Sequence, residues 1–365
     1  MGISSWLSNL VRPAESLVAV DIGASSIKLL EMDCSTQPYT IVDAAIRPTP
    51  ADCFNGYVLS RPEKVAEELS MLLSEGRFAG KRVAMAMPAP AVFTKRIKTA
   101  RMKLSELRDN IVFEARNVIP HNIEAVSLDF HVIGSAGKGQ LDVLVAAVKN
   151  EVLDSYMAAL SAAGLGAGVV DVDYFAVQNA YELSSPDSLA STVVLIHMGH
   201  RYSSIGICRN GEPMFNGDIQ VGTKMLTDAL VENLGVTVER AEEIKRSIAG
   251  GAEVSLEERE ALSEVSSHIA FECNRQLSFF WNASGADSGI ERILISGGGA
   301  LFPDLVAEVA QKTGIETSIL QPQIGLTLGD NVNQKSMQTL WPLMSVVIGL
   351  AFREPGDQED PEIEE

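Results

Sequence analysis

The stretch LVAVDIGASSIKLLEM, residues 17–32, contains an apolar run that ends in an acid, a turn of small residues and a second apolar run. Two apolar runs on either side of a short Gly/Ser segment predict a β-hairpin. The hairpin would place Asp21, small polar groups and Lys28 at its bend. Small residues let backbone N–H groups approach a phosphate, and Lys28 can neutralise its charge.

A second stretch repeats this design in the other half of the chain. At 193–211 an apolar strand ends at His197, a turn passes through Gly199, and another apolar strand follows. Both hairpins follow the pattern V-x-x-(D or H)-x-G and then reach Ser-Ser-Ile, with two extra residues in the second copy. Strand–glycine–strand patterns are common, so the repeat is weak evidence alone. It indicates one such unit in each half of the chain.

Two further signals follow in chain order. Gly222-Thr223 opens a helical stretch, and helix N-termini favour anions. Gly297-Gly298-Gly299 ends an apolar strand, and a glycine triplet permits close approach of a flat ligand. The sequence has no GxxxxGK[ST] loop, no complete GxGxxG, no GxSxG and no histidines at metal-ligand spacing. Each of the four signals is more often structural alone, but together in this order they indicate phosphate binding.

Composition limits the class of function. The chain has 365 residues with 29 basic and 48 acidic side chains, and its charge of −19 argues against a nucleic-acid binder. We expect a disordered acidic tail at 353–365. The basic cluster at 95–103 is expected to be a solvated strand or loop, with contact to acidic lipid or a partner as the alternative. Four scattered cysteines suit reduced thiols in the cytoplasm.

Neither end of the chain predicts a membrane span. The longest apolar stretch, 341–352, has about half of the roughly 20 residues that a span needs. Residues 1–15 predict a short amphipathic leader helix that packs on its own domain or frays, with membrane-surface contact as the alternative. Its apolar residues at helical spacing are Ile3, Trp6, Leu7, Leu10 and Val11.

Together these features resemble the actin-like ATPase superfamily, which includes actin, heat-shock chaperones and sugar kinases. Residues 17–32 and 194–207 look like its two phosphate motifs, and 293–303 resembles its adenosine motif. VGTKMLT at 221–227 resembles the glycine-led helix beside the nucleotide, and AEEIKR at 241–246 is similar to the helix that flanks adenine and ribose. The resemblance implies a two-lobed α/β fold, a duplicated ribonuclease H-like unit, that binds ATP and Mg²⁺.

Within the superfamily the sequence most resembles the PilM family of type IV pilus assembly proteins. VDIGASSIKLLE at 20–31 opens the resemblance, and FEARNVIP at 113–120, LDF at 128–130, AAVK at 146–149 and VDVD at 170–173 continue it. The middle stretches look like the inserted small subdomain that separates PilM and FtsA from actin. FtsA also carries a C-terminal membrane helix, whereas the acidic C-terminus here favours PilM.

The resemblance implies a division into subdomains. The nucleotide would lie between the two lobes, and a peptide groove would lie between the first subdomain and the inserted one. We expect subdomain 1A at 16–80 and 168–190, the inserted FtsA-type subdomain 1C at 81–167, subdomain 2A at 191–225 and 289–352, and subdomain 2B at 226–288.

It also implies roles for single residues. Asp21 matches the acid that orients Mg²⁺ through water, and Lys28 matches the lysine that actin uses on the phosphates. Asp173 matches the group that aligns the attacking water, with Gln178 as a second choice. The other implied cofactor-binding positions are Gly23, Ala24, Ser25, Ser26, Gly199, His200, Gly222, Thr223, Glu242, Lys245, Gly297, Gly298 and Gly299.

One position departs from the pattern of active members. The second motif normally begins with Asp, and His197 stands at this metal-side position. A neutral imidazole gives Mg²⁺ no anionic partner, and Mg²⁺ prefers oxygen ligands. Arg201 and Tyr202 are also bulkier than the glycines of efficient hydrolases. Because phosphoryl transfer needs water, metal and charge neutralisation together, we expect ATP binding with slow turnover or none.

The resemblance implies a partner as well. We expect the cytoplasmic N-terminal peptide of a PilN-like membrane protein to bind between roughly 16–80 and 81–167. This contact would recruit the chain from the cytoplasm to the inner membrane for pilus assembly and twitching motility. Contacts with other platform proteins and self-association are further expectations. The alternatives are an active ATPase or sugar-kinase-like phosphotransferase, against which His197 counts, and an FtsA-like filament former.

Overall fold

The structure is a computed structural model that describes residues 17–284 and 289–354, so the leader at 1–15 and most of the acidic tail lie outside the described residues. The first predicted hairpin is confirmed. Strands β1 (Leu17–Ile22) and β2 (Ser26–Asp33) pair antiparallel, with Asp21 opposite Lys28. No helix within these two ranges has the length and apolar character that crossing a membrane requires.

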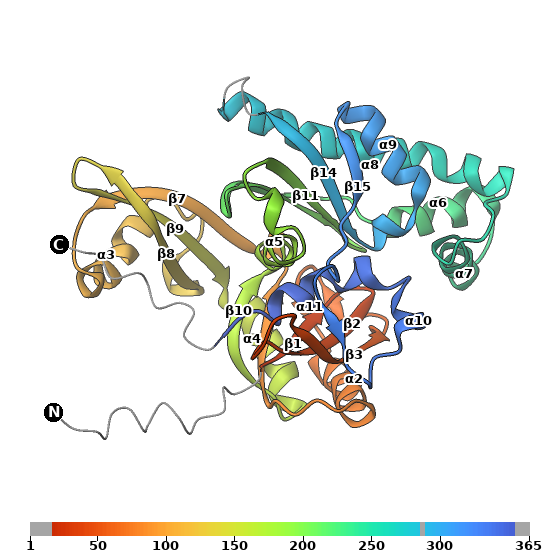
Figure 1. The fold of residues 1–365 in the computed structure, drawn as a ribbon, viewed down its shortest axis with the longest axis horizontal. Helices are drawn as coiled ribbons and strands as arrows, with labels where there is room; N and C mark the ends of the chain where they lie inside the picture. Colours follow the sequence, from red (N-terminus) through yellow and green to blue (C-terminus); the bar gives the residue numbers. More distant parts are fainter. Residues whose placement is uncertain (1–16, 285–288, 355–365) are drawn as a thin grey trace.

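The first lobe is built on a sheet with the strand order β10-β6-β1-β2-β3-β16. Its central strands are continuous apolar runs because helices cover both faces, α2 and α4 on one and α5 and α11 on the other (Figure 1). The remaining elements of this lobe are β3 (Thr40–Pro48), α2 (Pro62–Glu75), β6 (Arg82–Met87), α4 (Asn150–Ala162), β10 (Gly166–Val172), α5 (Asp173–Ser184), β16 (Thr327–Leu328) and α11 (Ser345–Leu350).

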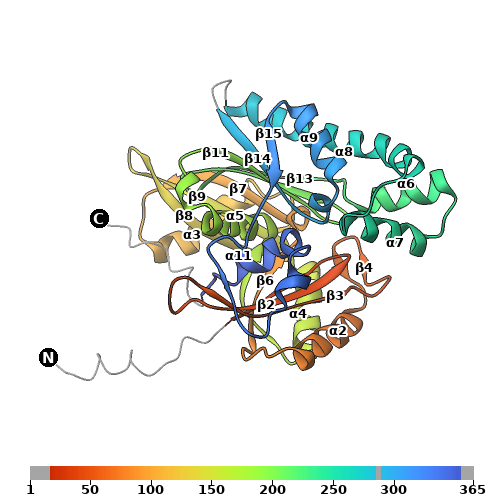
Figure 2. The same ribbon diagram turned by 45° about the vertical axis from the view of Figure 1, so that its right-hand side comes forward.

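A small hairpin of β4 (Phe54–Asn55) and β5 (Val58–Leu59) belongs to the first lobe and lies on the side that faces the second lobe (Figure 2). Its tip is Gly56-Tyr57, and Gly56 has a φ of 59°, which favours glycine. The backbone N–H of Leu59 donates to Ser155 Oγ on α4 at 3.0 Å, so the base of the hairpin is anchored to the lobe.

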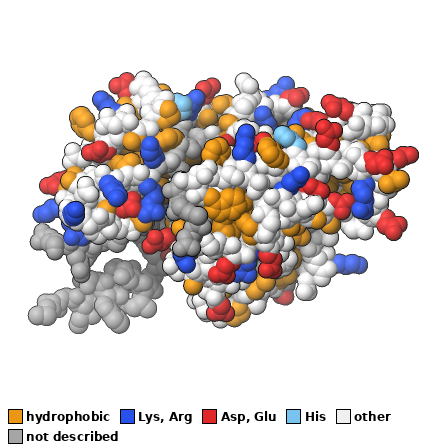
Figure 3. Space-filling view, turned by 90° about the horizontal axis from the view of Figure 1, so that it is seen from above, with side chains coloured by type: hydrophobic (Ala, Val, Ile, Leu, Met, Phe, Trp, Pro, Cys, Tyr) orange, Lys and Arg blue, Asp and Glu red, His pale blue; other side chains and the backbone are white. Residues whose placement is uncertain are grey.

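The inserted unit is a three-stranded sheet, β7-β9-β8, covered by α3 and built around its own core. Its elements are β7 (Val92–Ala100), α3 (Leu104–Arg116), β8 (Val126–Gly137) and β9 (Gln140–Lys149). The expected boundaries 81–167 are too wide, because β6 pairs with β1 and β10, and α4 packs on α2. The basic cluster at 95–103 lies on β7 and the loop after it, and Figure 3 shows Lys and Arg side chains over this part of the surface.

The second lobe repeats the topology of the first. Its sheet has the order β13-β12-β11-β14-β15, with two antiparallel pairings on one side of β11 and two parallel pairings on the other, as around β1. The weak sequence repeat is therefore confirmed as a repeat of the fold. Its elements are β11 (Thr192–Met198), β12 (Ser203–Arg209), β13 (Glu212–Ile219), α6 (Lys224–Leu234), α7 (Val238–Ala249), α8 (Leu256–Ser284), β14 (Ile290–Gly297), α9 (Pro303–Thr313) and β15 (Glu316–Ile319).

The chain returns to the first lobe after β15. Strand β16 pairs with β3, a short helix α10 (Gln334–Met337) follows, and α11 packs against α5 and β1. Helix α11 approaches α5 so closely that a Cβ on Gly349 would lie 1.7 Å from the Ala176 carbonyl oxygen. The assignment of all of 289–352 to the second lobe is therefore wrong, because this segment supplies buried apolar surface to the first sheet.

Candidate functional site

The bend of the first hairpin is held by three contacts. Lys28 Nζ lies 2.7 Å from Asp21 Oδ2, and the Lys28 side chain is buried. The Gly23 N–H donates to the Ser26 carbonyl at 3.1 Å, and Thr49 Oγ1 donates to the Gly23 carbonyl at 2.6 Å. The turn is therefore preformed, with the ion pair beside it. It also contains two further predicted residues, the half-buried Ala24 and the exposed Ser25.

The bend of the second hairpin packs against the start of α6. The Gly199 N–H donates to the Tyr202 carbonyl at 3.1 Å, which closes the turn. The Thr223 N–H donates to the Gly199 carbonyl at 2.9 Å, and a Cβ on Gly222 would lie 2.5 Å from the His200 carbonyl oxygen. Gly222 is thus required for the packing of its own lobe, and it brings the predicted helix N-terminus beside the second turn.

Two glycines of the triplet have packing roles, and the third would accept a Cβ without a clash. A Cβ on Gly297, whose φ is 79°, would lie 2.6 Å from the Met198 carbonyl oxygen, and one on Gly299 would lie 2.5 Å from Met198 Cβ. A Cβ on Gly298 would meet Thr223 Oγ1 at 3.7 Å, an ordinary contact. Gly297 and Gly299 therefore let the ends of β11 and β14 approach each other, whereas a Cβ on Gly298 would be accommodated in contact with Thr223.

His197 lies between the two bends. Its Nδ1 lies 3.0 Å from Ser296 Oγ at the end of β14. Burial lowers the pKa of His197 to about 4, with a raising effect from Asp21 and a lowering effect from Lys28, so the imidazole is neutral at pH 7. Within residues 17–284 and 289–354, no three His, Cys, Asp or Glu side chains are grouped as metal ligands. The chemistry of this imidazole, held by Ser296, does not fit a magnesium ligand.

Asp173, the first residue of α5, has a carboxylate that is only half satisfied. Its Oδ2 accepts hydrogen bonds from the Tyr202 hydroxyl at 2.8 Å and from the Ala89 N–H at 3.2 Å. Burial raises the Asp173 pKa to about 6, against lowering effects from Tyr202, Ala89 and Ser204 and a raising effect from Asp21. In the described structure Asp173 Oδ1 and Ser204 Oγ are both buried and have no well-aligned hydrogen bond, but Ser204 lies close enough to lower the Asp173 pKa.

Gln178 does not join this site. Its Nε2 donates to the Gly211 carbonyl at 2.9 Å and to Glu182 Oε1 at 2.7 Å, which directs the amide toward the β12–β13 turn. The second choice for aligning a water is therefore wrong. The side chain serves the packing of α5 against the second lobe.

Helices α6 and α7 share a buried polar cluster. Lys245 Nζ donates to Thr227 Oγ1 at 2.8 Å and to Glu242 Oε1 at 2.9 Å. Burial lowers the pKa of Lys245. Burial also lowers the pKa of His200, and the charge of Lys245 adds to this effect while Glu242 opposes it. The structure thus brings the second turn and the predicted nucleoside-side residues within electrostatic reach of one another.

Sequence reasoning missed some residues of the site. Ser204 lies in the repeated Ser-Ser-Ile pattern, so the repeat itself could have indicated it. Thr227 lies on the buried face of α6, where a polar residue in an apolar stripe is a usable signal. Tyr57 carries no sequence signal, because it reaches Tyr202 only through the tertiary fold, with ring centroids 5.9 Å apart.

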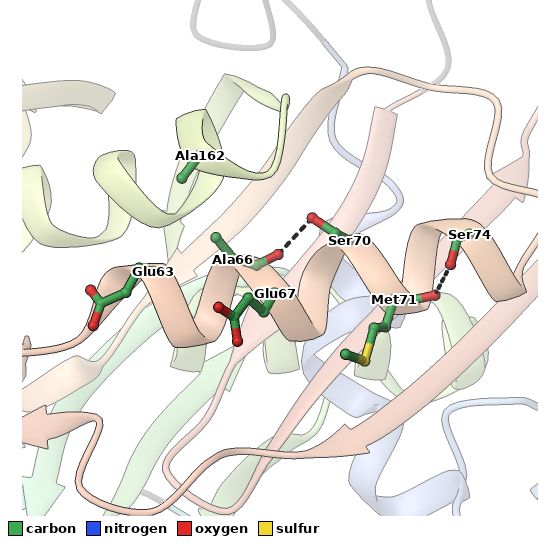
Figure 4. Close-up of a pocket in the computed structure, with 7 residues that line it drawn as sticks. All are labelled: Glu63, Ala66, Glu67, Ser70, Met71, Ser74 and Ala162. Atoms are coloured by element: carbon green, nitrogen blue, oxygen red, sulfur yellow. Dashed lines mark hydrogen bonds between the residues drawn. The ribbon is translucent and has the colours of Figure 1, made fainter.

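An open groove of about 440 Å³ lies along the outer side of α2 and beside the end of α4 (Figure 4). None of the predicted site residues lines it, so it is separate from the two bends. Figure 4 shows Ser70 and Ser74 bonded to backbone carbonyls of their own helix. The lining residues are Glu63, Ala66, Glu67, Ser70, Met71, Ser74 and Ala162.

Residues 19–355 match the protein family described as type IV pilus assembly protein PilM. The chain is also similar to a chain in the solved PilM-PilN type IV pilus biogenesis complex, with a TM-score of 0.83, 26% identity, and coverage of 93% of this chain and 99% of that chain. The ethanolamine utilization protein EutJ from Carboxydothermus hydrogenoformans matches with a TM-score of 0.56, 14% identity, and coverage of 93% and 91%. These similarities confirm the expected actin-like α/β fold.

Proposed function

Because the chain belongs to the PilM family of type IV pilus assembly proteins, we propose that it is an ATP-binding scaffold of the pilus inner-membrane platform. In this proposal it binds the N-terminal peptide of a PilN-like membrane protein and is held at the cytoplasmic face of the membrane through that contact. The observation that carries the proposal is the similarity to the PilM-PilN complex over nearly the full length of both chains.

The two bends supply the residues that would hold the nucleotide phosphates. The Lys28 ammonium, the dipole of α6 and the turn N–H groups that are not already bonded favour an anion. The Thr223 and Lys224 N–H groups at the start of α6 donate to the second turn instead. The cluster of Thr227, Glu242 and Lys245 lies on the nucleoside side. Gly298 lies next to Thr223 and has no side chain, so a flat group could approach its backbone closely. A net charge of −19 does not oppose this binding, because these contacts act locally.

Magnesium would be held mainly by the phosphates and by water, since Mg²⁺ keeps several waters in such sites. Asp21 and Asp173 are the carboxylates that would orient its waters, and the buried Oδ1 of Asp173, which has no well-aligned hydrogen bond, supports this fit. When bound, the ion supplies charge neutralisation to the phosphates. His197 adds no oxygen ligand.

We propose that turnover is slow or absent. A neutral imidazole replaces one carboxylate, and Tyr202 occupies one oxygen of Asp173. The test is phosphate release from the purified protein with Mg²⁺-ATP. Turnover of about 1 s⁻¹ or faster, the low end of typical enzymes, that is lost in Asp21→Ala would contradict this part of the proposal.

Strand β8 is the edge that we propose for the partner peptide. It has a neighbouring strand on one side only in the described structure, and its start lies beside α4, where Ser127 Oγ donates to Asn150 Oδ1 at 2.9 Å. The other edge strand, β7, already contacts the second lobe, since Arg96 Nη1 donates to the Pro213 carbonyl at 3.3 Å. An extended peptide gains main-chain hydrogen bonds at such an edge.

The peptide proposal is tested by fluorescence anisotropy with a labelled N-terminal peptide of the PilN-like partner, with and without ATP. A scrambled peptide of the same composition is the control. Hydrogen exchange locates the contact, and we expect protection along β8 and the start of α4 rather than along β7. Absence of measurable affinity under both conditions would overturn the peptide proposal.

A further inference from the structure

The tip of the β4–β5 hairpin joins the two lobes. Arg201 Nη1 donates to the Gly56 carbonyl at 2.7 Å, and the Tyr57 hydroxyl donates to Gln220 Oε1 at 3.0 Å. The rings of Tyr57 and Tyr202 meet edge to face at 79°. On the first lobe these contacts come from the two-residue tip of the hairpin. On the second lobe they come from the turn after β11, which contains Arg201 and Tyr202, and from Gln220, which follows β13.

Tyr202 makes a second crossing in the same place. Its hydroxyl donates to Asp173 Oδ2, and Asp173 is fixed to the first lobe by the Ala89 N–H. Burial and the neighbouring Asp173 carboxylate raise the pKa of Tyr202 well above its usual value, so the phenol stays a donor at neutral pH. The turn after β11 is therefore bonded both to the hairpin tip and to the start of α5.

Elsewhere the lobes meet through a continuous apolar core. Side chains of β11 such as Val193 and Leu195 pack in one cluster with Ala176 and Val177 of α5 and with α11. That core keeps the lobes associated, whereas each polar contact at the hairpin contributes only about 0.5–3 kcal/mol net, with the Arg201 guanidinium at the upper end, because water can replace it. The hairpin side is thus the side that can open while the core acts as the hinge.

We propose that Gly56, Tyr57, Arg201 and Tyr202 form a latch that closes the two lobes over bound nucleotide phosphates and sets the rate of nucleotide entry and exit. This inference rests on the nucleotide binding proposed above. The second-lobe half of the latch shares its turn with Gly199 and His200, whose backbone is predicted to contact phosphate. A phosphate held by that turn fixes the position of Tyr202 and so favours the closed latch.

The experiment compares Tyr202→Phe and Tyr57→Phe with the wild type, because each change removes one hydroxyl and keeps the ring. Tyr174→Phe is the matched control: its hydroxyl donates to Thr94 Oγ1 at 2.9 Å, between α5 and β7 and outside the latch. Stopped-flow kinetics with a fluorescent ADP analogue give association and dissociation rates. Hydrogen exchange of nucleotide-free protein reports the amides of 53–59 and 199–202.

We expect both latch variants to release the analogue at least threefold faster than the wild type, and their reporter amides to exchange faster by a similar factor. Tyr174→Phe should change neither. The same rates in latch variants and wild type in both measurements would overturn the latch. If one latch variant fails to fold, the other carries the same test. If the wild type binds no nucleotide, the proposed function fails. Faster hydrogen exchange of the reporter amides in the nucleotide-free latch variants would then still show that these contacts hold the two lobes together, and unchanged exchange would show that they do not.

Discussion

Lys28 and Asp21 are cross-strand neighbours that form an ion pair, with Nζ and Oδ2 2.7 Å apart and both side chains at most 15% exposed. The pair sits at the phosphate bend, so the ammonium that would neutralise a phosphate is bonded to a carboxylate while no ligand is bound. Lys28 can serve both groups because an ammonium has three donor hydrogens. The ion pair thus keeps the lysine oriented toward the bend.

Removing one partner separates stability from ligand binding. Lys28→Met leaves Asp21 without its counter-ion in a largely buried place, which should lower the free energy of unfolding by about 3 kcal/mol. We expect the same variant to lose at least tenfold in ATP affinity, because the side-chain cation that lies at the first bend is gone. Urea denaturation and nucleotide titration measure the two effects.

The double variant Asp21→Asn/Lys28→Met is the control for this prediction. It removes the unpaired charge, so most of the lost stability should return while ATP affinity stays low. Full recovery of affinity in the double variant would show that Lys28 acts only by balancing Asp21, which contradicts a phosphate contact.

Asp173 and His197 should affect stability in opposite directions as the pH falls. Burial raises the Asp173 pKa to about 6, so between about pH 6 and 4 the folded state takes up its proton first and acid raises the free energy of unfolding. Burial lowers the His197 pKa to about 4, so between its ordinary value of 6.5 and 4 the unfolded state takes up the proton first and acid lowers that free energy. Each effect is of the order of 2–3 kcal/mol, so they largely cancel.

Single substitutions should reveal the separate effects of Asp173 and His197 on stability. Between pH 6 and 4 the free energy of unfolding of Asp173→Asn should fall by about 2–3 kcal/mol more than that of the wild type. The free energy of unfolding of His197→Asn should fall by less than that of the wild type. Denaturant curves at several pH values measure these differences, and the other carboxylates cancel in the comparison with wild type. Parallel pH profiles for all three proteins would show that neither group is perturbed as described.

Two adjacent glycines should respond differently to a methyl group. Gly299→Ala forces a Cβ to within 2.5 Å of Met198 Cβ and should destabilise the second lobe by about 1–3 kcal/mol, whereas Gly298→Ala meets nothing closer than 3.7 Å. We expect Gly298→Ala to keep its stability and lose ATP affinity, because its new methyl lies beside Thr223. Thermal unfolding and nucleotide titration distinguish the two. Equal destabilisation of both variants would contradict the different roles.

The sequence predicted the two hairpins because everything that makes them is local, namely two apolar runs and a small-residue turn. The extent of the inserted unit depends on contacts that are distant in sequence. Nothing in the apolar run of β6 indicates whether it joins β1 or the inserted sheet, and only pairing with β1 and β10 decides. The return of α11 to the first lobe likewise depends on the close approach of Gly349 to α5.

Side-chain direction limited the prediction of the site. Asp173 and Gln178 are five residues apart on α5, which places them about 140° apart around the helix, so only one of them can point at the bends. The sequence showed both as polar groups near VDVD, and the contact of Gln178 with Gly211 decides between them. The residues of the latch could not be predicted from the sequence either, because Tyr57 meets Tyr202 only after both lobes have formed.

His197 stands where active relatives of the superfamily are expected to carry a metal-side acid. His197→Asp would place a carboxylate at the end of β11, where Ser296 can donate to it and where Asp21 lies within electrostatic reach. Because carboxylate oxygen is a ligand that Mg²⁺ accepts, we expect nucleotide affinity to become strongly metal-dependent, with at least a tenfold loss on adding EDTA. The wild type should lose less, since its imidazole contributes nothing to the ion.

His197→Asn is the matched control, because it has the shape of Asp without the charge and should respond to EDTA like the wild type. Titration of the three proteins with ATP, with and without Mg²⁺, gives the comparison. Without metal the new carboxylate lies near Asp21, so His197→Asp should also be less stable than His197→Asn, and Mg²⁺-ATP should narrow that difference through binding. An aspartate variant that follows the asparagine variant in both affinity and stability would place the metal away from His197. It would then be held by the phosphates with Asp21 and Asp173 alone.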